Sequence, residues 1–248
     1  MPTPHLTARI SARSGPLPLV EPIALIFDLD GTLIDSAPEI HAAANRALAT
    51  EGLPPLTLAE VKSFIGNGVA VLLARCLHAL GQPDNGPLLD RLKASFLADY
   101  ETRFSLTTLY PGVTDLLDTC ARHGHPMAIC TNKPEGPTRA VLTHFNLIHH
   151  FPVIIGGDTL PQRKPDPAPL RATLAALNTP RALFIGDSEV DATTAHATPL
   201  PFALFTGGYR TKPIADLAPL LSFDHHSHLY EKIFTLSPRE LDGTASEG

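Results

Sequence analysis

Two acidic residues, Asp28 and Asp30, directly follow the apolar run 23–27 and precede Gly31 and Thr32. In an extended chain, side chains two residues apart point the same way, so both carboxylates can address one site. Paired carboxylates repel each other unless a cation lies between them or one is protonated. Oxygen ligands with room for water and a phosphate oxygen suit Mg²⁺. The pair is therefore consistent with a magnesium site, although an Asx-type turn at a strand end explains it about equally well.

Three later groups of polar residues also follow apolar runs. Thr131 and Asn132 offer a hydroxyl and an amide that can donate hydrogen bonds to phosphate oxygens. Lys164 can neutralise charge on a phosphoryl group, and Asp187 and Asp191 are acidic residues four apart at a helix start. Each group alone also fits a structural role, such as loop capping, a solvated lysine or compensation of a helix dipole. Together the four groups supply the nucleophile, acid, phosphate donors, cation and metal ligand that phosphoryl transfer requires.

The apolar runs before these groups have the length of strands. Most are separated by helix-like stretches, which is typical of a parallel sheet with crossover helices. The runs are 23–27, 126–131, 151–157, 181–186 and 201–206. Because ligands of open α/β sheets bind beyond the carboxyl ends of the strands, we predict a Rossmann-like parallel α/β fold with its site at that edge.

The interval after the first run contains helical patterns and no convincing strand. One of these patterns begins with Thr57 and Glu60, the spacing of a capping box. The helical patterns cover residues 37–52, 57–65, 68–81 and 87–104. We therefore expect an all-helical cap inserted after the first strand.

These patterns predict how the chain is divided. The α/β core comprises residues 22–35 and 106–236, and the helical cap comprises residues 36–105. Residues 1–21 and 237–248 are polar or lack a hydrophobic period, so we expect loose tails at both ends.

Within the cap, Gly66, Asn67 and Gly68 could present backbone N–H groups to a small anion, because glycine tolerates close approach and unusual dihedrals. A simple helix–helix turn explains the same residues about equally well. Lys62 and Arg75 are alternative anion partners, although such residues on amphipathic helices are more often solvated.

Composition excludes several classes of protein. The 248 residues carry a formal net charge of −6, from 19 Lys and Arg against 25 Asp and Glu, and no long basic run, so we expect no nucleic-acid partner. No stretch approaches the ~20 apolar residues of a membrane helix, so we expect no membrane association. The cysteines Cys76, Cys120 and Cys130 are few and far apart in apolar stretches, which indicates reduced thiols in a cytoplasmic protein.

Two clusters of histidines offer potential metal ligands. His149 and His150 follow a helix, and His225, His226 and His228 lie near the C-terminal end without a matching carboxylate pattern. Because closed metal sites need several convergent ligands, we expect no metal site at either cluster.

The polar groups, in this order, resemble the four motifs of the haloacid dehalogenase superfamily. These motifs correspond here to Asp28 and Asp30, to Thr131, to Lys164, and to Asp187 and Asp191. The resemblance covers about residues 22–210, and the helical insertion resembles the C1 cap of that superfamily. More narrowly, five segments are similar to bacterial phosphoglycolate phosphatases: DLDGTLIDSAPEIHAAANRAL, FIGNGVAVLLARCL, TNKPEGPTRAVL, IGGDTLPQRKPDPAPL and IGDSEVDATTA.

The resemblance implies a mechanism. Asp28 would attack phosphorus and carry a transient aspartyl-phosphate, while Asp30 would protonate the leaving group and then activate water. Mg²⁺ would be held by Asp28, the backbone carbonyl of Asp30 and Asp187, with Asp191 orienting these ligands.

The resemblance also implies how the substrate is bound. Thr131, Asn132 and Lys164 would contact the oxygens that accumulate charge in the transition state. A cap that closes on glycolate makes the expected substrate a small phosphorylated organic acid, 2-phosphoglycolate. The expected oligomeric state is monomer or homodimer.

Three alternatives remain open on the sequence. A sugar-phosphate mutase would use the same Asp28 and Asp30. A phosphonate hydrolase would need a cap lysine that forms a Schiff base, but the segment around Lys62 does not resemble that motif. A non-catalytic scaffold would bind a partner through the cap, although the intact motifs argue against it.

Overall fold

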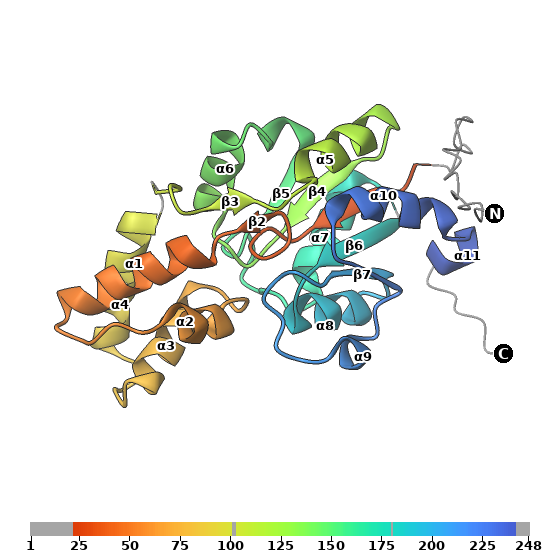
Figure 1. Ribbon diagram of the computed structural model, residues 1–248. Coiled ribbons are helices and arrows are strands. Elements are labelled where there is room, and N and C mark those ends of the chain that lie inside the picture. Colours follow the sequence, from red (N-terminus) through yellow and green to blue (C-terminus); the bar gives the residue numbers. More distant parts are fainter. Residues whose placement is uncertain (1–21, 101–102, 180, 242–248) are drawn as a thin grey trace, which may run out of the picture.

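A computed structural model describes residues 22–100, 103–179 and 181–241 of the chain. Its centre is a six-stranded sheet of order β5-β4-β1-β6-β7-β8, in which every neighbouring pair of strands is parallel (Figure 1). The strands are β1 (Ala24–Phe27), β4 (Met127–Cys130), β5 (Val153–Ile155), β6 (Ala182–Gly186), β7 (Phe202–Phe205) and β8 (Leu221–Phe223). The predicted fold class and all five predicted strands are confirmed. The edge strand β8 was not predicted.

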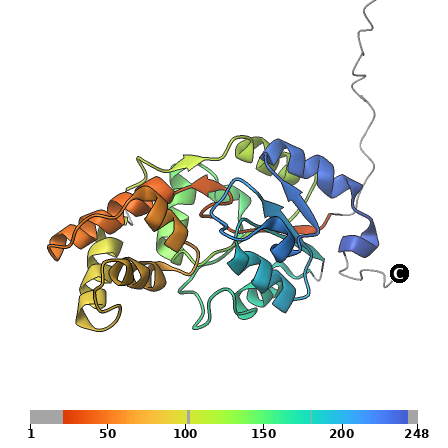
Figure 2. The same cartoon turned by 60° about the horizontal axis from the view of Figure 1, so that its bottom comes forward.

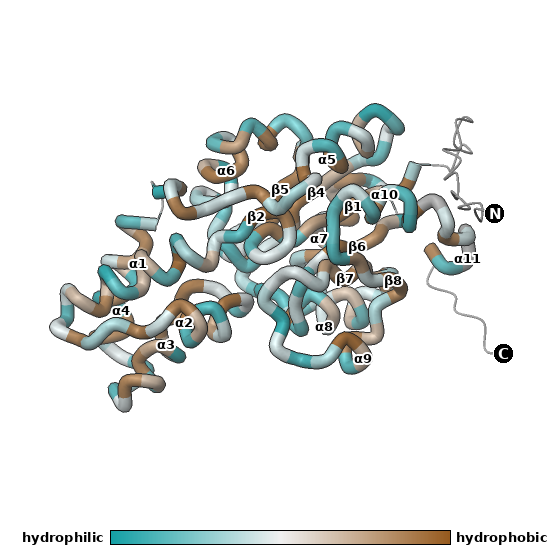
Figure 3. The backbone as a smooth tube through the Cα atoms, viewed as in Figure 1, coloured by the Kyte–Doolittle hydropathy of each residue, from teal (hydrophilic) through white to brown (hydrophobic). Residues whose placement is uncertain are grey.

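Both faces of the sheet are buried. Along β1, Leu25 and Phe27 point into one apolar cluster, and Ala24 and Ile26 point into another on the opposite face. The first cluster is covered by α5 (Val113–Arg122), α6 (Glu135–His144) and α10 (His226–Thr235). The second is covered by α7 (Ala168–Leu177), α8 (Glu189–Ala197) and α9 (Ile214–Leu217). Burial on both faces explains why the strands are continuous apolar runs, drawn brown in Figure 3.

The segment between β1 and β4 contains four helices with an apolar cluster of their own. They are α1 (Ala37–Thr50), α2 (Leu58–Phe64), α3 (Val69–Ala79) and α4 (Pro87–Tyr100). The predicted capping box at the start of α2 is present, with Thr57 and Glu60 each bonding the other's backbone N–H. Figures 1 and 2 show these helices grouped together at one end of the molecule, beside the sheet.

A short antiparallel ribbon lies where the chain leaves and re-enters the sheet. It pairs β2 (Ile34–Asp35) with β3 (Thr108–Leu109) and was not predicted, because two-residue strands leave no period in the sequence. The ribbon pairs the segment that leads from the sheet into the four helices with the segment that returns from them. The exact domain boundaries stay a prediction.

The ends of the described chain require one correction. Residues 237–248 were expected to be loose, but Pro238–Leu241 form the short helix α11 and Leu241 is buried in the core. The loose-tail prediction is therefore wrong for this stretch. The remaining tail residues, 1–21 and 242–248, lie outside the described part of the chain.

Cys76, Cys120 and Cys130 are buried free thiols, as expected. Among the described residues, no helix is both long and apolar enough to cross a membrane.

Candidate active site

Asp28 and Asp30 line one cavity between the carboxyl edge of the sheet and the four inserted helices. Asp28 follows β1, is largely buried, and donates its backbone N–H to the carbonyl oxygen of Ile185 at 2.8 Å. The cavity has a volume of about 50 Å³. Since one water needs roughly 10–15 Å³ on this measure, the space suits a ligand of few heavy atoms. The cavity is lined by Asp28, Asp30, Ile40, Ile65, Gly66, Gly68, Val69, Leu72, Phe96, Tyr100, Thr131, Asn132, Lys133 and Pro134.

Lys164 lies between two carboxylates. Its Nζ is 3.0 Å from Oδ1 of Asp28 and 2.6 Å from Oδ1 of Asp191. Burial lowers the pKa of the Lys164 ammonium, but the charges of Asp191 and Asp28 outweigh burial and raise the pKa above its ordinary value. Lys164 therefore stays cationic beside Asp28.

Burial shapes the chemistry of Asp28 itself. It raises the pKa of this carboxyl from 3.8 to about 6, while the charge of Lys164 opposes the rise and that of Asp191 adds to it. With the proton removed, Asp28 is a poorly solvated carboxylate with one cation beside it. Such a group is suited to act as a nucleophile.

Asp187 is buried and held from two sides. Its Oδ1 accepts from the Thr32 hydroxyl at 2.9 Å, and its Oδ2 accepts from the Tyr209 backbone N–H at 2.6 Å. A Cβ on Gly208 would lie 2.3 Å from the Cβ of Asp187, so only glycine allows this close approach. Burial, with the charges of Asp191 and Asp28, raises the pKa of Asp187 well above its ordinary value.

The acidic cluster fits a divalent cation. One carboxylate oxygen from each of Asp28, Asp187 and Asp191 lies within 4.8 Å of the other two. Oδ1 of Asp28 is buried without a hydrogen-bond partner among the described residues, and the Lys164 ammonium, 3.0 Å away, is its ion-pair partner. Three buried carboxylates against one ammonium group leave an excess of negative charge that a cation would offset. Hard oxygen donors of this kind are the ligands of Mg²⁺.

Asp191 has less capacity to bind metal than the other two. Its Oδ2 accepts from the backbone N–H groups of Asp187 and Ser188 and from the Ser188 hydroxyl at 2.6 Å. Its Oδ1 accepts from Lys164. Asp191 therefore closes the capping box of α8 and orients its neighbours, which fits the predicted supporting role.

Asp30 is paired with Lys133, a residue to which the sequence assigned no role. Lys133 Nζ lies 3.2 Å from Oδ1 of Asp30, which also accepts from the Ser36 hydroxyl at 2.6 Å. Lys133 Nζ also donates to the Tyr100 hydroxyl of α4 and lies 4.0 Å from the centre of that ring. Burial lowers the pKa of Lys133, although Asp30 opposes this shift.

Thr131 and Asn132 lie where the sequence placed them, but their hydrogen bonds differ from expectation. The Thr131 hydroxyl accepts from the Lys133 backbone N–H at 3.2 Å. Asn132 Nδ2 donates to the carbonyl oxygens of Gly66 at 2.9 Å and Lys164 at 2.8 Å. Both amide hydrogens of Asn132 are thus engaged by the protein. The oxygen of that amide is buried without a hydrogen-bond partner among the described residues.

The glycine loop of the inserted segment reaches the cavity through Gly66 and Gly68. Their φ angles of 121° and 84° are ones that other residues rarely adopt. Asn67 does not line the cavity, because its Oδ1 accepts from Arg75 at 2.9 Å. Arg75 therefore braces this loop, and it also donates to the Phe64 carbonyl.

The structure does not support the alternative anion partners. The described residues that form the cavity wall include neither Arg75 nor Lys62. Lys62 Nζ instead lies 5.0 Å from the ring centre of Tyr209. The Tyr209 hydroxyl donates to Asp35 at 2.8 Å and accepts from the Ser36 backbone N–H, so this ring joins several loops at the sheet edge.

Four site residues received no assignment from the sequence: Ser36, Tyr100, Lys133 and Tyr209. Lys133 and Tyr209 had a usable signal, since Lys133 directly follows Asn132 and Tyr209 follows Gly208 after a predicted strand. Tyr100 had none, because an aromatic residue at helical spacing is ordinarily a core residue.

The chain is similar to known proteins over most of its length. Residues 25–205 match the model of the haloacid dehalogenase-like hydrolase family. A phosphoglycolate phosphatase of Cereibacter sphaeroides is 52% identical over 206 residues, which cover 83% of this chain and 94% of that protein. One from Rhodospirillum rubrum is 43% identical over 216 residues, covering 84% and 89%. A crystal structure of a predicted phosphoglycolate phosphatase from Haemophilus somnus has a TM-score of 0.80 at 29% identity, covering 86% of this chain and 99% of that one.

Proposed function

The chain belongs to the haloacid dehalogenase-like hydrolase family, and on this premise we propose that it hydrolyses 2-phosphoglycolate to glycolate and phosphate. Its relatives and family make it a phosphatase, a phosphoric monoester hydrolase. The identity of the ester is a proposal that rests on the names of the relatives and on the cavity.

The observation that carries the proposal is the placement of Asp28, which lines a small cavity, beside the buried Lys164. Asp28 attacks phosphorus, and the P–O bond to the leaving alkoxide breaks as the Asp28 O–P bond forms. Lys164, 3.0 Å away, reduces the repulsion between the attacking carboxylate and the phosphate oxygens. The product of this step is an aspartyl-phosphate on Asp28, which water then hydrolyses.

Asp30 is the proposed acid and base. It shares the cavity with Asp28, and Ser36 and Lys133 fix its carboxylate in position. Asp30 gives a proton to the leaving oxygen in the first step and takes one from the attacking water in the second, which regenerates its starting state.

Mg²⁺ is the proposed cofactor. Asp28 and Asp187 would hold it, Asp191 would orient them, and the backbone carbonyl of Asp30 would serve as a further ligand. When bound, the ion supplies a positive charge that stabilises the phosphate oxygens in the transition state. Thr131 and Lys164 bind those oxygens directly, and the walls of the cavity exclude bulk water.

Substrate size and charge follow from the cavity. Its volume of about 50 Å³ and its closure by Gly66 and Gly68 favour a short ester. Lys133 supplies a cation in the cavity wall itself, in addition to Lys164, which pairs with Asp28. A substrate with a phosphate at one end and a carboxylate at the other matches these two cations.

The test compares kcat/KM for phosphate release from 2-phosphoglycolate, p-nitrophenyl phosphate and a hexose phosphate at fixed Mg²⁺, with Asp28→Asn as the control for contaminating activity. We expect 2-phosphoglycolate to be preferred and the activity to disappear with EDTA or in the variant. A preference for another ester would overturn the substrate assignment alone. Conversion of the hexose phosphate to an isomer without phosphate release would instead indicate a mutase.

Two further expectations accompany the proposal. The three buried free thiols fit a reducing compartment, so we propose a cytoplasmic location. Monomer or homodimer stays a prediction.

A further inference from the structure

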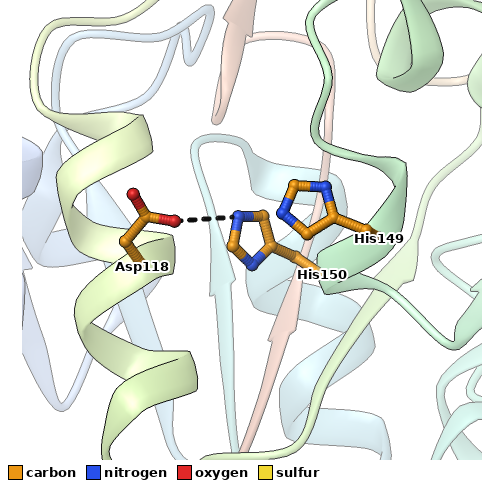
Figure 4. A group of neighbouring side chains, drawn as sticks. All are labelled: Asp118, His149 and His150. Carbon is orange, nitrogen blue, oxygen red and sulfur yellow. Dashed lines mark ion pairs between the residues drawn. The ribbon is translucent and has the colours of Figure 1, made fainter.

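A second group of metal-ligating side chains lies outside the catalytic cavity. It comprises Asp118 on α5 together with His149 and His150 on the short 3₁₀ helix η1 (Ile148–His150). One ligand atom from each lies within 4.8 Å of the other two. Nε2 of His150 is 3.3 Å from Oδ1 of Asp118. Figure 4 shows Asp118 pointing from its helix toward the His150 ring, with the His149 ring beside it.

This group lies at the opposite edge of the sheet from Asp28. It borders a surface hollow of about 810 Å³, whose lining includes Pro126 and Met127 at the amino end of β4. Thr131 follows the carboxyl end of the same strand, so the two sites are separated along β4 by roughly 15 Å at 3.3 Å per residue. The group is therefore independent of the catalytic carboxylates.

Two of the three side chains are exposed and the third is buried. His150 is buried, and its ring lies 4.0 Å from that of His149 and 6.3 Å from that of Phe151, measured between centroids. His149 and Asp118 are exposed, so an ion can enter from solvent and complete its coordination with water. The packing of His150 holds one of the three potential ligands in a fixed position.

The donor set identifies the class of ion. Two imidazole nitrogens and one carboxylate oxygen suit Zn²⁺ and neighbouring transition metals, whereas Mg²⁺ and Ca²⁺ prefer oxygen ligands alone. Sequence reasoning expected no metal site at His149 and His150. The structure supplies Asp118, a carboxylate 31 residues earlier in the chain, as a third potential ligand.

We propose that Asp118, His149 and His150 bind a divalent transition-metal ion such as Zn²⁺, at a site separate from the catalytic one. The ion joins α5 to η1, which immediately precedes β5. Because the three ligands converge only in the folded chain, binding stabilises the fold by mass action.

The test is a calorimetric titration of the full chain with Zn²⁺ in excess Mg²⁺, so that Mg²⁺ occupies the catalytic carboxylates. We expect one Zn²⁺ to bind, and His149→Gln and Asp118→Asn to weaken binding at least tenfold while kcat with Mg²⁺ is unchanged. His78→Gln is the matched control. His78 is an exposed histidine 3.8 Å from a carboxylate oxygen of Asp84, and among the described residues it belongs to no cluster of three metal-ligating side chains.

Three results would overturn the proposal. The first is an absence of saturable Zn²⁺ binding by the unmodified protein. The second is binding that survives both substitutions at full strength. The third is binding that is lost in Asp187→Asn but retained in His149→Gln, which would assign the ion to the catalytic carboxylates. Unchanged kcat and far-UV circular dichroism in the variants show that folding is not the cause of a loss.

Discussion

The side-chain amide of Asn132 donates a hydrogen bond to the carbonyl oxygen of Gly66, 2.9 Å away. The first residue belongs to a loop at the carboxyl edge of the sheet, and the second belongs to the glycine loop of the inserted helices. The same amide donates to the carbonyl oxygen of Lys164 at 2.8 Å. One side chain thus joins the loop that carries Lys164 to the glycine loop that borders the cavity.

Asn132→Ala removes both of these hydrogen bonds and leaves two carbonyl groups without their partner. Each net hydrogen bond contributes about 1 kcal/mol, so we expect KM for 2-phosphoglycolate to rise about tenfold and the melting temperature to fall. Steady-state kinetics and thermal unfolding measure the two effects. Asn85→Ala, in an exposed loop of the inserted segment, is the control. An unchanged KM in Asn132→Ala would show that the link has no part in closing the cavity.

Asp28→Asn is expected to abolish turnover and to stabilise the metal-free protein. Burial is the main reason that the pKa of Asp28 rises from 3.8 to about 6. Between these values the folded chain holds a proton that the unfolded chain has released, so the group lowers stability as pH rises through this window. About two pKa units correspond to on the order of 3 kcal/mol.

Denaturant unfolding in EDTA measures this effect. We expect the stability gain of Asp28→Asn at pH 7.5 to vanish below about pH 4, where the wild-type carboxyl is protonated in both states. Lys164 remains paired with Asp191 in the variant, so the substitution leaves no isolated buried cation. A variant that is less stable than wild type at pH 7.5 would contradict the argument.

Lys133→Met tests the second cation of the cavity. The variant keeps an apolar stem but loses the charge proposed to face the substrate carboxylate. We expect KM for 2-phosphoglycolate to rise at least tenfold, which corresponds to a loss of about 1.4 kcal/mol of binding free energy. We expect KM for p-nitrophenyl phosphate to change much less, because this ester lacks the carboxylate. Because Lys133 also pairs with Asp30, kcat is expected to fall for both esters. Equal changes of KM for both esters would remove Lys133 from substrate recognition.

Strands and motif residues were predictable from the sequence for a physical reason. The central strands are buried on both faces, so each appears as a continuous apolar run, and the residues that follow such runs meet at one edge of the sheet. The edge strand β8 escaped detection because it includes the half-buried polar residue Ser222 and so is not a continuous apolar run.

Contacts between distant segments were not predictable in the same way. Tyr100 meets Lys133, and Asp118 meets His150, only after helices pack against loops that come later in the chain. Neither pair leaves a period or a spacing in the sequence. The loop role of Asn132 is of this kind too, because its partners are backbone carbonyls, which carry no sequence signature.

His226 contacts the loop after β1 that contains Thr32. It is fully buried against the rings of Phe205 and Phe223, and its Nε2 lies 2.8 Å from the carbonyl oxygen of Thr32. That carbonyl requires a donor, so Nε2 carries the proton. Since the Thr32 hydroxyl holds Asp187, His226 is a positioning residue for the proposed metal ligand.

His226→Phe leaves the Thr32 carbonyl without its donor, which costs about 1–3 kcal/mol of stability. We expect weaker Mg²⁺ binding, seen as a higher Mg²⁺ concentration for half-maximal activity, with kcat largely recovered at saturating Mg²⁺. His228→Phe, on the exposed side of the same helix, is the control. An equal Mg²⁺ requirement in the variant and wild type would limit His226 to a packing role.

The pH dependence of stability gives a second readout for His226. Burial lowers its pKa from 6.5 to about 4, so the unfolded chain binds a proton between these values that the folded chain does not. This residue therefore contributes stability that is present above pH 6.5 and is lost as pH falls toward 4. Denaturant unfolding across this range, compared between wild type and His226→Phe, should show the wild-type curve falling more steeply as pH decreases. Parallel curves would mean that the imidazole is not kept neutral by its burial beneath the loop.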